Sequence, residues 1–220
     1  MMKRILACLL LLNLNFAWGI FDDTRFMPKT IKLEFEQSYQ SVTGKTKSSK
    51  GILDYKKPGH LRLKEFKDNT EFVANKDMSW YYVPPFKSGE KGSVQINSAK
   101  NNALIKVLDS LKYGLNKNEF YDVTEKKVDQ FELKFIDQKS KELKISKVDL
   151  FFRTVVFPEK TDHKQRNSKI LEFHDLQSLS IHYQDGQKVD LKITKIEENI
   201  TFADKNFEFQ TPPNTEIIKN

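Results

Sequence analysis

The sequence is nearly devoid of cysteine. The one cysteine among its 220 residues, Cys8, lies in an apolar run near the N-terminus. Disulfides within the chain are therefore excluded, and the fold must depend on the size of its own hydrophobic core. Thiolate zinc sites are excluded for the same reason.

Signatures of enzyme active sites are also lacking. The chain has no Gly-x-Ser-x-Gly elbow, no phosphate-binding glycine loop and no His-Glu-x-x-His pair. Its four histidines, His60, His163, His174 and His182, match no zinc-binding spacing. The sequence thus predicts no catalytic residue, no metal site, no cofactor and no enzymatic activity.

Charge of one sign is not concentrated anywhere. The 37 Lys and Arg residues are interleaved with 30 Asp and Glu residues, and the formal net charge is +7. This pattern is typical of a solvated surface, with weak attraction to anionic membranes as the alternative. We expect no nucleic-acid partner. No stretch after the N-terminal run is long and apolar enough to span a membrane.

The first 19 residues have the pattern of a cleavable signal peptide. Lys3 and Arg4 precede an apolar run over residues 5–12, and Ala17 and Gly19 are small residues at the expected cleavage positions. We therefore expect export to the periplasm and a single mature domain over residues 20–220.

Cys8 also ends a short lipobox-like segment. A lipoprotein signal would need an apolar region of about 7–15 residues before the cysteine. Only three apolar residues separate Arg4 from Cys8. We therefore expect no lipid attachment there.

Most of the mature chain alternates apolar and polar residues, which is typical of half-buried strands. In residues 31–39, for example, Ile31, Leu33 and Phe35 share one face. Segments of this kind are joined by tight turns such as Pro58-Gly59 and Asp185-Gly186. Strands are expected at residues 31–39, 51–56, 61–66, 71–74, 78–83, 119–123, 130–136, 144–156, 170–176, 179–183, 188–196 and 206–210.

One helix is expected, from residue 97 or 98 to Tyr113. Leu104, Leu108 and Leu111 repeat at helical spacing, and Gly114 suits the position after the helix end. An antiparallel sheet of about ten strands curls or closes. A single amphipathic helix cannot form a second layer, but it can plug or cover such a sheet.

Aromatic residues fall on the apolar faces of neighbouring expected strands, including Phe35, Tyr55, Trp80 and Tyr82. Two readings of this pattern stay open from the residues alone. The aromatic rings form a solid core, or they line a cavity that holds an apolar ligand.

A further set of residues forms motifs that span nearly the whole mature chain. In chain order they are Ile31, Phe35, Gln37, Gly51, Leu53, Lys57, Pro58, Leu61, Arg62, Leu63, Trp80, Tyr82, Pro84, Asp185, Gly186, Asn199, Asp204, Phe207, Phe209, Pro212, Pro213 and Ile217. The order and spacing of these motifs together resemble those of LolA-type outer-membrane lipoprotein carriers.

The resemblance implies a half-open antiparallel β-barrel with an α-helical lid. It also implies a monomeric periplasmic carrier that shields the acyl chains of lipoproteins. Such a carrier takes its cargo from an inner-membrane ATP-driven transporter and delivers it to an outer-membrane acceptor. The residues expected to bind lipid are Leu33, Phe35, Leu53, Tyr55, Leu61, Leu63, Trp80, Tyr82, Leu104, Leu108 and Leu111.

Three features depart from the family. Lys57 stands where the family has the arginine that holds its lid shut, so Lys57 is the expected lid-control residue. The N-terminal helix of the family is short or missing, because Pro28 interrupts the segment available for it. The region 150–175 is longer than in the family, with an extended loop expected at residues 157–169. Alternative functions are a periplasmic sensor or adaptor for acylated ligands, a carrier of another envelope lipid, and an enzyme acting on such lipids.

Overall fold

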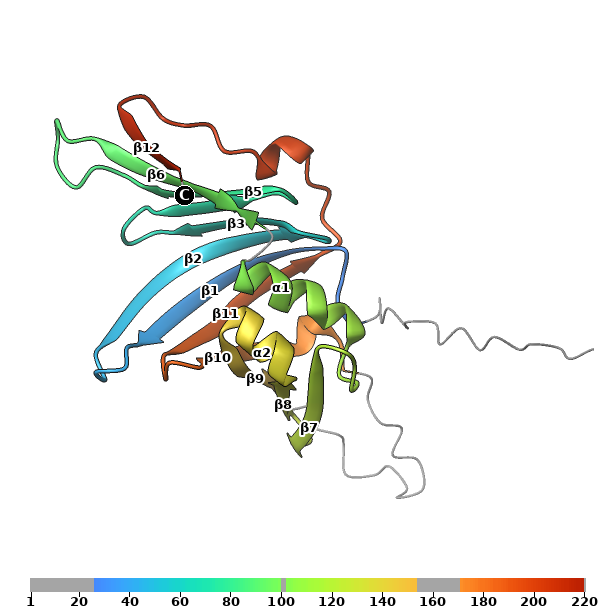
Figure 1. Ribbon diagram of the computed structural model, residues 1–220. Helices are drawn as coiled ribbons and strands as arrows, with labels where there is room; N and C mark the ends of the chain where they lie inside the picture. The colour runs from blue at the N-terminus through green and yellow to red at the C-terminus, as the bar shows by residue number, and fades with distance from the viewer. Residues whose placement is uncertain (1–25, 100–101, 154–170, 220) are drawn as a thin grey trace, which may run out of the picture.

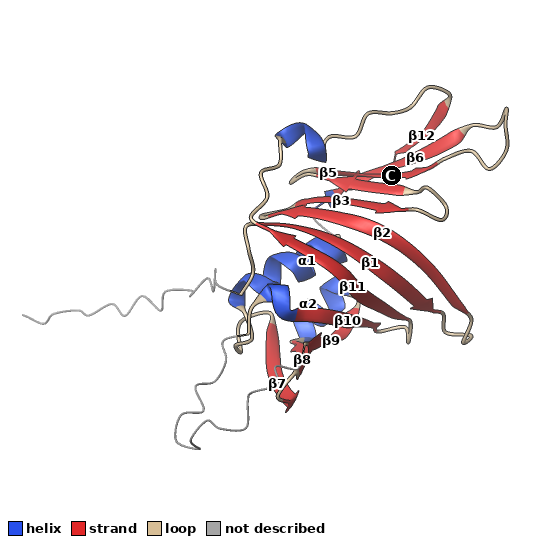
Figure 2. Cartoon of the chain, turned by 180° about the vertical axis from the view of Figure 1, so that it is seen from behind, coloured by secondary structure: helices blue, strands red, loops and turns tan. Residues whose placement is uncertain are grey.

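The computed structural model describes residues 26–99, 102–153 and 171–219. One long sheet curls through this part of the chain, and two short helices, α1 and α2, lie on its concave face (Figures 1 and 2). The expected signal peptide with Cys8 and the loop expected at residues 157–169 lie outside the described residues, as does His163.

The sheet has twelve strands in the order β12-β6-β5-β4-β3-β2-β1-β11-β10-β9-β8-β7. Neighbouring strands are antiparallel except for β12 and β6, which are parallel. The strands are β1 (Thr30–Gln40), β2 (Thr46–Lys56), β3 (His60–Glu65), β4 (Glu71–Ala74), β5 (Met78–Val83), β6 (Gly92–Ser98), β7 (Tyr121–Lys127), β8 (Gln130–Phe135), β9 (Ile145–Phe152), β10 (Leu176–Tyr183), β11 (Lys188–Glu198) and β12 (Thr215–Lys219).

The sheet stays open. Strands β12 and β7 are its two edges and are not paired with each other in the described part of the chain. A curled, open, antiparallel sheet with helices on its inner side is the expected half-open barrel, so the predicted fold class is confirmed.

Strand β1 shows how the sequence produces the buried concave face of the sheet. Ile31, Leu33 and Phe35 point to the concave side and are at most 5% exposed. Gly51 on β2 is the cross-strand partner of Phe35. A Cβ atom at Gly51 would lie 2.8 Å from the Cζ of the Phe35 ring. The missing side chain therefore lets the aromatic ring lie directly against the neighbouring strand.

The helix α1 (Ala103–Ser110) begins later than the sequence predicts. Ser98 ends strand β6 and pairs with Met78, so the helix does not begin there. Asn102 is the N-cap instead, and its side chain accepts a 3.0 Å hydrogen bond from the backbone NH of Ile105. The 3₁₀ turn η2 (Leu111–Tyr113) continues α1 as far as Gly114, whose φ of 65° ends it.

Other expected boundaries are wrong in the C-terminal half. The segment 206–210 is not a strand. Its first two residues belong to the 3₁₀ turn η4 (Asp204–Phe207). The last strand, β12, comes after Pro212-Pro213 rather than before it. The expected strand at 170–176 contains the 3₁₀ turn η3 (Phe173–Asp175). The sequence reading also missed β6 and the helix α2 (Asp137–Leu143).

The core lies between the concave face and the helices. It extends from β3 across the sheet to β7, and it includes the apolar side of α1 and the start of the described chain at Phe26 and Met27. Many large side chains of this core, among them Tyr55, Tyr121 and Leu133, are less than 2% exposed, which makes it large enough for a domain without disulfides. Among the residues described, no helix is long and apolar enough to cross a membrane.

Candidate lipid-binding site

The concave face of β1, β2 and β3 carries the residues that the sequence assigns to the lipid site. Leu33 pairs with Leu53, and Leu53 pairs with Leu63. Tyr55 pairs with Leu61 in the same way. Cross-strand partners point to the same side of a sheet, so these residues form one apolar surface together with Phe35. The prediction that these six residues share a face is confirmed.

The same surface continues beyond β1, where the sequence reading assigned no site residue. Leu191 and Ile193 on β11 pair with β1 residues, and Leu179 and Ile181 on β10 extend the row. All four belong to the core or pack against it. Their period-two spacing in the expected strands was the signal that could have identified them.

Trp80 and Tyr82 do not belong to this surface, so their assignment to the cavity is wrong. Leu63 pairs with Phe72, and Phe72 pairs with Tyr81. Tyr81 is therefore the β5 residue on the concave side, while its neighbours Trp80 and Tyr82 point to the convex side. All four residues from Trp80 to Val83 are apolar or aromatic, so alternation along β5 could not reveal its inner face.

On the convex side, Trp80 and Tyr82 belong to a second, smaller apolar layer. Trp80 pairs with Val73 and Tyr82 with Val94. The Tyr82 ring lies 5.7 Å from the ring of Phe209, measured between centroids. These aromatic residues therefore hold the C-terminal segment against the outside of β4–β6.

Helix α1 covers the concave face with the leucines predicted for it. Leu108 and Leu111 are 3% and 1% exposed, and the half-buried Leu104 packs against the core. In Figure 1, α1 crosses in front of β1 and β2, with α2 beside it. The space that an acyl chain would need against these strands is therefore occupied by the helix itself.

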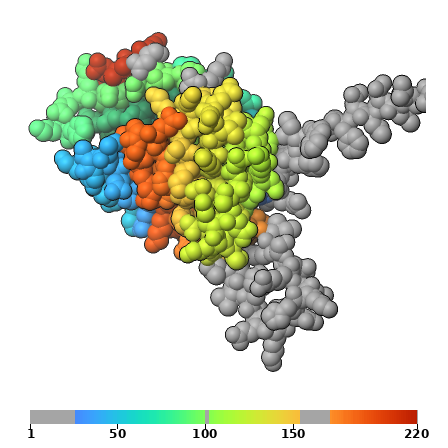
Figure 3. Space-filling model, turned by 60° about the horizontal axis from the view of Figure 1, so that its bottom comes forward, coloured from blue at the N-terminus to red at the C-terminus, as the bar shows by residue number. Residues whose placement is uncertain are grey.

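The cover becomes less complete toward β4 and β5. Leu63 and Phe72 are only half-buried, and Tyr81 on the same face is 42% exposed. Figure 3 shows the green β5–β6 region projecting beyond the part of the molecule that the yellow α2 covers. The apolar face is thus less completely covered on this side of α1.

A hydrogen-bonded carboxylate ties α1 to the sheet. The Tyr55 hydroxyl on β2 donates to Oδ1 of Asp109 on α1, and the backbone NH of Gly59 donates to the same oxygen at 3.2 Å. Gly59 sits in the β2–β3 turn with a φ of 74°. The sequence reading missed Asp109, because an acidic residue on a helix gives no sign that its donors lie on a distant strand and in the turn after it.

The end of α1 is held by a second tyrosine. The Tyr121 hydroxyl on β7 lies 3.1 Å from the carbonyl oxygen of Ser110 and 2.9 Å from that of Gly114. Tyr121 is fully buried, and burial strongly raises the pKa of its hydroxyl, so it remains a neutral donor. Tyr121 thus bonds two carbonyls at the C-terminal end of the segment formed by α1 and η2.

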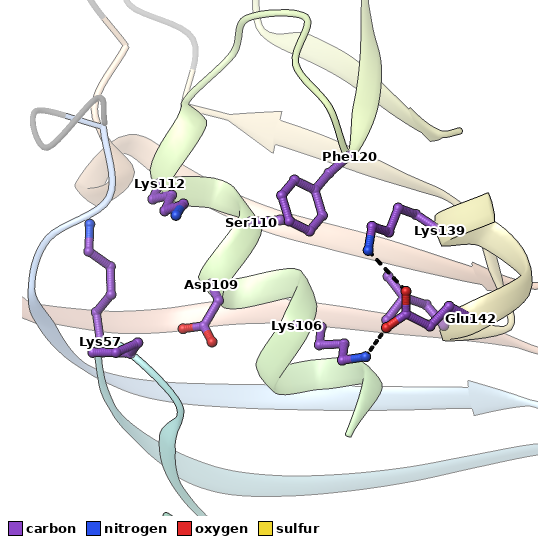
Figure 4. Close-up of a pocket in the computed structure, with 10 residues that line it drawn as sticks. Lys57, Lys106, Asp109, Ser110, Lys112, Phe120, Lys139 and Glu142 are labelled. Carbon is purple, nitrogen blue, oxygen red and sulfur yellow. Dashed lines mark hydrogen bonds and ion pairs between the residues drawn. The ribbon is translucent and has the colours of Figure 1, made fainter. Parts of the chain in front are cut away.

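Lys57 nevertheless lies beside α1. It lines a pocket of about 300 Å³ together with Asp109, Ser110 and Lys112 near the C-terminal end of that helix (Figure 4). Its position suits a cation that complements the helix dipole. Control of the lid by Lys57 remains a prediction.

The helices α1 and α2 are joined through Glu142. This carboxylate pairs with Lys106 on α1, and it lies 3.0 Å from Nζ of Lys139 on α2 (Figure 4). Hydrogen bonds from these two ammonium groups lower the pKa of Glu142 below its usual value of 4.5. The pair thus braces the lid helix against its neighbour at neutral pH.

The described histidines lie in separate places. His60 packs edge-on against Phe207, and His174 lies 3.1 Å from Glu172. His182 lies 2.8 Å from Asp149 on the neighbouring strand. Within residues 26–99, 102–153 and 171–219, no group of three His, Cys, Asp or Glu side chains could hold a metal ion.

Comparison with known proteins gives matches among solved structures alone. No family model matches the chain. No curated protein matches it either. A LolA superfamily protein from Nitrosomonas europaea aligns over 88% of this chain and 97% of its own, with 12% identity and a TM-score of 0.45.

Two further solved structures match in a similar way. A DUF1329 family protein from Desulfovibrio piger aligns over 84% of this chain and 92% of its own, with 15% identity and a TM-score of 0.49. A domain from Vibrio parahaemolyticus described as an outer membrane lipoprotein-sorting protein aligns over 81% and 88%, with 9% identity and a TM-score of 0.40. The family suspected from the sequence is thus represented among these distant structural matches.

Proposed function

We propose that this protein is a periplasmic carrier of acylated cargo and that lipoproteins are its main cargo. In this account the acyl chains lie between the concave face of the sheet and helix α1. The observation that carries the proposal is that a short helix covers an apolar sheet face with its own leucines and is tied down by a few polar contacts. The motifs shared with LolA-type carriers and the signal-peptide pattern support export and a transport role.

Helix α1 and an acyl chain gain similar free energies when they cover the concave face. Fully burying a leucine or isoleucine side chain is worth about 1.5–3 kcal/mol, so Ile105, Leu108 and Leu111 together contribute about 4.5–9 kcal/mol, and the half-buried Leu104 adds less. One long acyl chain contributes about 10 kcal/mol, from about 0.8 kcal/mol per methylene. An exchange between helix and lipid is therefore close to balanced, as a carrier that must both load and release requires.

The hydrogen bonds to Asp109 can then favour the state in which α1 covers the face. A hydrogen bond to a charged group is worth about 1.5–3 kcal/mol. That is smaller than the acyl-chain term, so it holds the empty carrier closed without preventing loading. In this account the inner-membrane transporter supplies the cargo and the outer-membrane acceptor removes it, and the carrier itself needs no covalent chemistry.

Transfer of a labelled diacylated lipopeptide between two populations of vesicles tests the proposal. The purified full-length protein should raise the transfer rate above the spontaneous rate in proportion to its concentration. The Leu63→Glu variant should not, because it places a charge on the apolar face. A transfer rate that does not depend on the wild-type protein would contradict the carrier function. A sensor or adaptor role would then be the remaining alternative.

A further inference from the structure

The pocket beside the lid has an excess of positive charge. Its lining includes four lysines and two carboxylates, namely Lys57, Lys106, Lys112, Lys139, Asp109 and Glu142. Figure 4 shows these side chains arranged around one hollow, with the lysines on both sides of α1. A small anion that entered the hollow would meet several ammonium groups at once.

Both carboxylates in the pocket already have donors. Glu142 is paired with Lys106 and Lys139, and Asp109 accepts hydrogen bonds from Tyr55 and Gly59. Their negative charge is therefore partly compensated, while the four lysines together exceed it by two charges. The side chains of Lys106 and Lys139 are 26% and 29% exposed, so their charges are screened less than on an open surface.

The walls of the same pocket are apolar. Pro58, Phe120 and Leu143 also line it. The ammonium of Lys139 lies 5.2 Å from the centroid of the Phe120 ring, which fixes the charge next to an apolar wall. Leu143 is 4% exposed and belongs to the hydrophobic core beneath the helices. The pocket thus places positive charges above an apolar floor that is continuous with the proposed acyl site.

We infer that this pocket binds the phosphate headgroup of an anionic lipid. The inference rests on the proposed carrier function, and it extends the cargo class to glycerophospholipids. Lysine ammonium groups bind phosphate oxygens as mobile point charges, and the volume of about 300 Å³ suits a compact headgroup. A flat membrane surface would instead require exposed lysines on a convex face, so the hollow favours a single headgroup.

Binding of dihexanoyl phosphatidylglycerol to the full-length protein, measured by calorimetry, tests the inference. Replacing both Lys57 and Lys112 by glutamine should weaken binding about tenfold, the size expected for partly buried charge contacts. The matched control is Lys91→Gln with Lys87→Gln, which removes the same charge in the distant β5–β6 connection. Thermal unfolding of each variant verifies that it is folded.

Three other probes separate the outcomes. The neutral dye N-phenyl-1-naphthylamine should bind equally to wild type and to the pocket variant, since it has no headgroup. If the dye binds neither protein, the proposed acyl site and carrier function are contradicted. Binding of glycerol phosphate, which has a headgroup but no acyl chain, then tests the pocket separately. Inorganic phosphate that binds as tightly as the lipid would show an ion site unconnected with lipid and overturn the inference. Equal loss of phosphatidylglycerol binding in pocket and control variants would overturn it as well.

Discussion

The hydroxyl of Tyr55, on the apolar face of β2, donates a hydrogen bond to the carboxylate of Asp109 on α1. The ring of Tyr55 is fully buried among the residues of the proposed lipid site. One side chain thus contributes both to the surface that would shelter an acyl chain and to the contact that keeps α1 over that surface. Entry of lipid next to this ring would disturb the same hydrogen bond that holds the helix.

The variant Tyr55→Phe should loosen the lid without changing the apolar face. It removes one of the two donors to the half-buried Asp109 and leaves the ring, at a cost of about 1.5–3 kcal/mol, which is typical of a hydrogen bond to a charged group. We expect faster amide hydrogen exchange in α1 and faster loading of a neutral hydrophobic dye. Asp109→Asn, which retains an acceptor, should have a smaller effect. Unchanged exchange in α1 of Tyr55→Phe would show that the bond does not hold the helix.

The variant Leu63→Glu should abolish binding of a hydrophobic dye while the protein remains folded. Leu63 is only half-buried, so the sheet tolerates the change better there than at Leu53 or Leu61. The control Lys64→Gln alters the charge by the same amount on the opposite face of the same strand. Equal dye binding by wild type and Leu63→Glu would exclude this face as the lipid site.

The variant Trp80→Ala should lower stability and leave lipid binding intact, because Trp80 lies on the convex side of β5. We expect a loss of about 2 kcal/mol in the free energy of unfolding, less than for a fully buried ring. Denaturant unfolding measures the first effect and dye titration the second. Loss of dye binding in a folded Trp80→Ala variant would show that Trp80 lines the cavity.

The variants Lys57→Leu and Lys57→Arg test control of the lid. Lys57→Leu should retain binding of a diacylated lipopeptide, which has no phosphate headgroup, but alter the rate of cargo transfer to an acceptor, because it removes a cation near the C-terminal end of α1. Lys57→Arg should slow loading, since a guanidinium can bridge two acceptors. If all three proteins load and transfer alike, Lys57 has no role in the lid.

Acid should weaken the brace between α1 and α2. The pKa of Glu142 is lowered in the folded protein, so its contribution to stability is present above the usual value of 4.5 and is lost as the pH falls through the lowered pKa. Glu142→Gln should remove this part of the pH dependence of unfolding below pH 4.5. An identical acid profile in wild type and Glu142→Gln would show that the ion pairs add nothing.

The sequence predicted the fold class and the inner faces of β1–β3, because strict alternation leaves one choice of register there. It failed at β5, where consecutive aromatic residues hide the alternation, and Trp80 and Tyr82 were assigned to the wrong face. The β12 strand escaped notice because it is short, follows two prolines and pairs in parallel with β6, far away in the sequence.

The polar contacts of the lid could not be predicted for a different reason. Asp109 meets Tyr55 and Gly59 across 54 and 50 residues of sequence. No local pattern encodes such a meeting. The leucines of α1, by contrast, were found from helical spacing alone, since burial of one helix face is a local property of the sequence.

The most direct test of the account is whether α1 leaves the concave face when lipid binds. In the mature protein, which lacks Cys8 once the expected signal peptide is cleaved, Leu108→Cys places a thiol where the side chain is 3% exposed. The rate of its alkylation by a water-soluble maleimide should rise when a diacylated lipopeptide is added. The thiol of the control Leu150→Cys, at a fully buried position on β9, should stay unreactive. An unchanged alkylation rate at position 108, with lipopeptide demonstrably bound, would contradict displacement of the helix by the acyl chains.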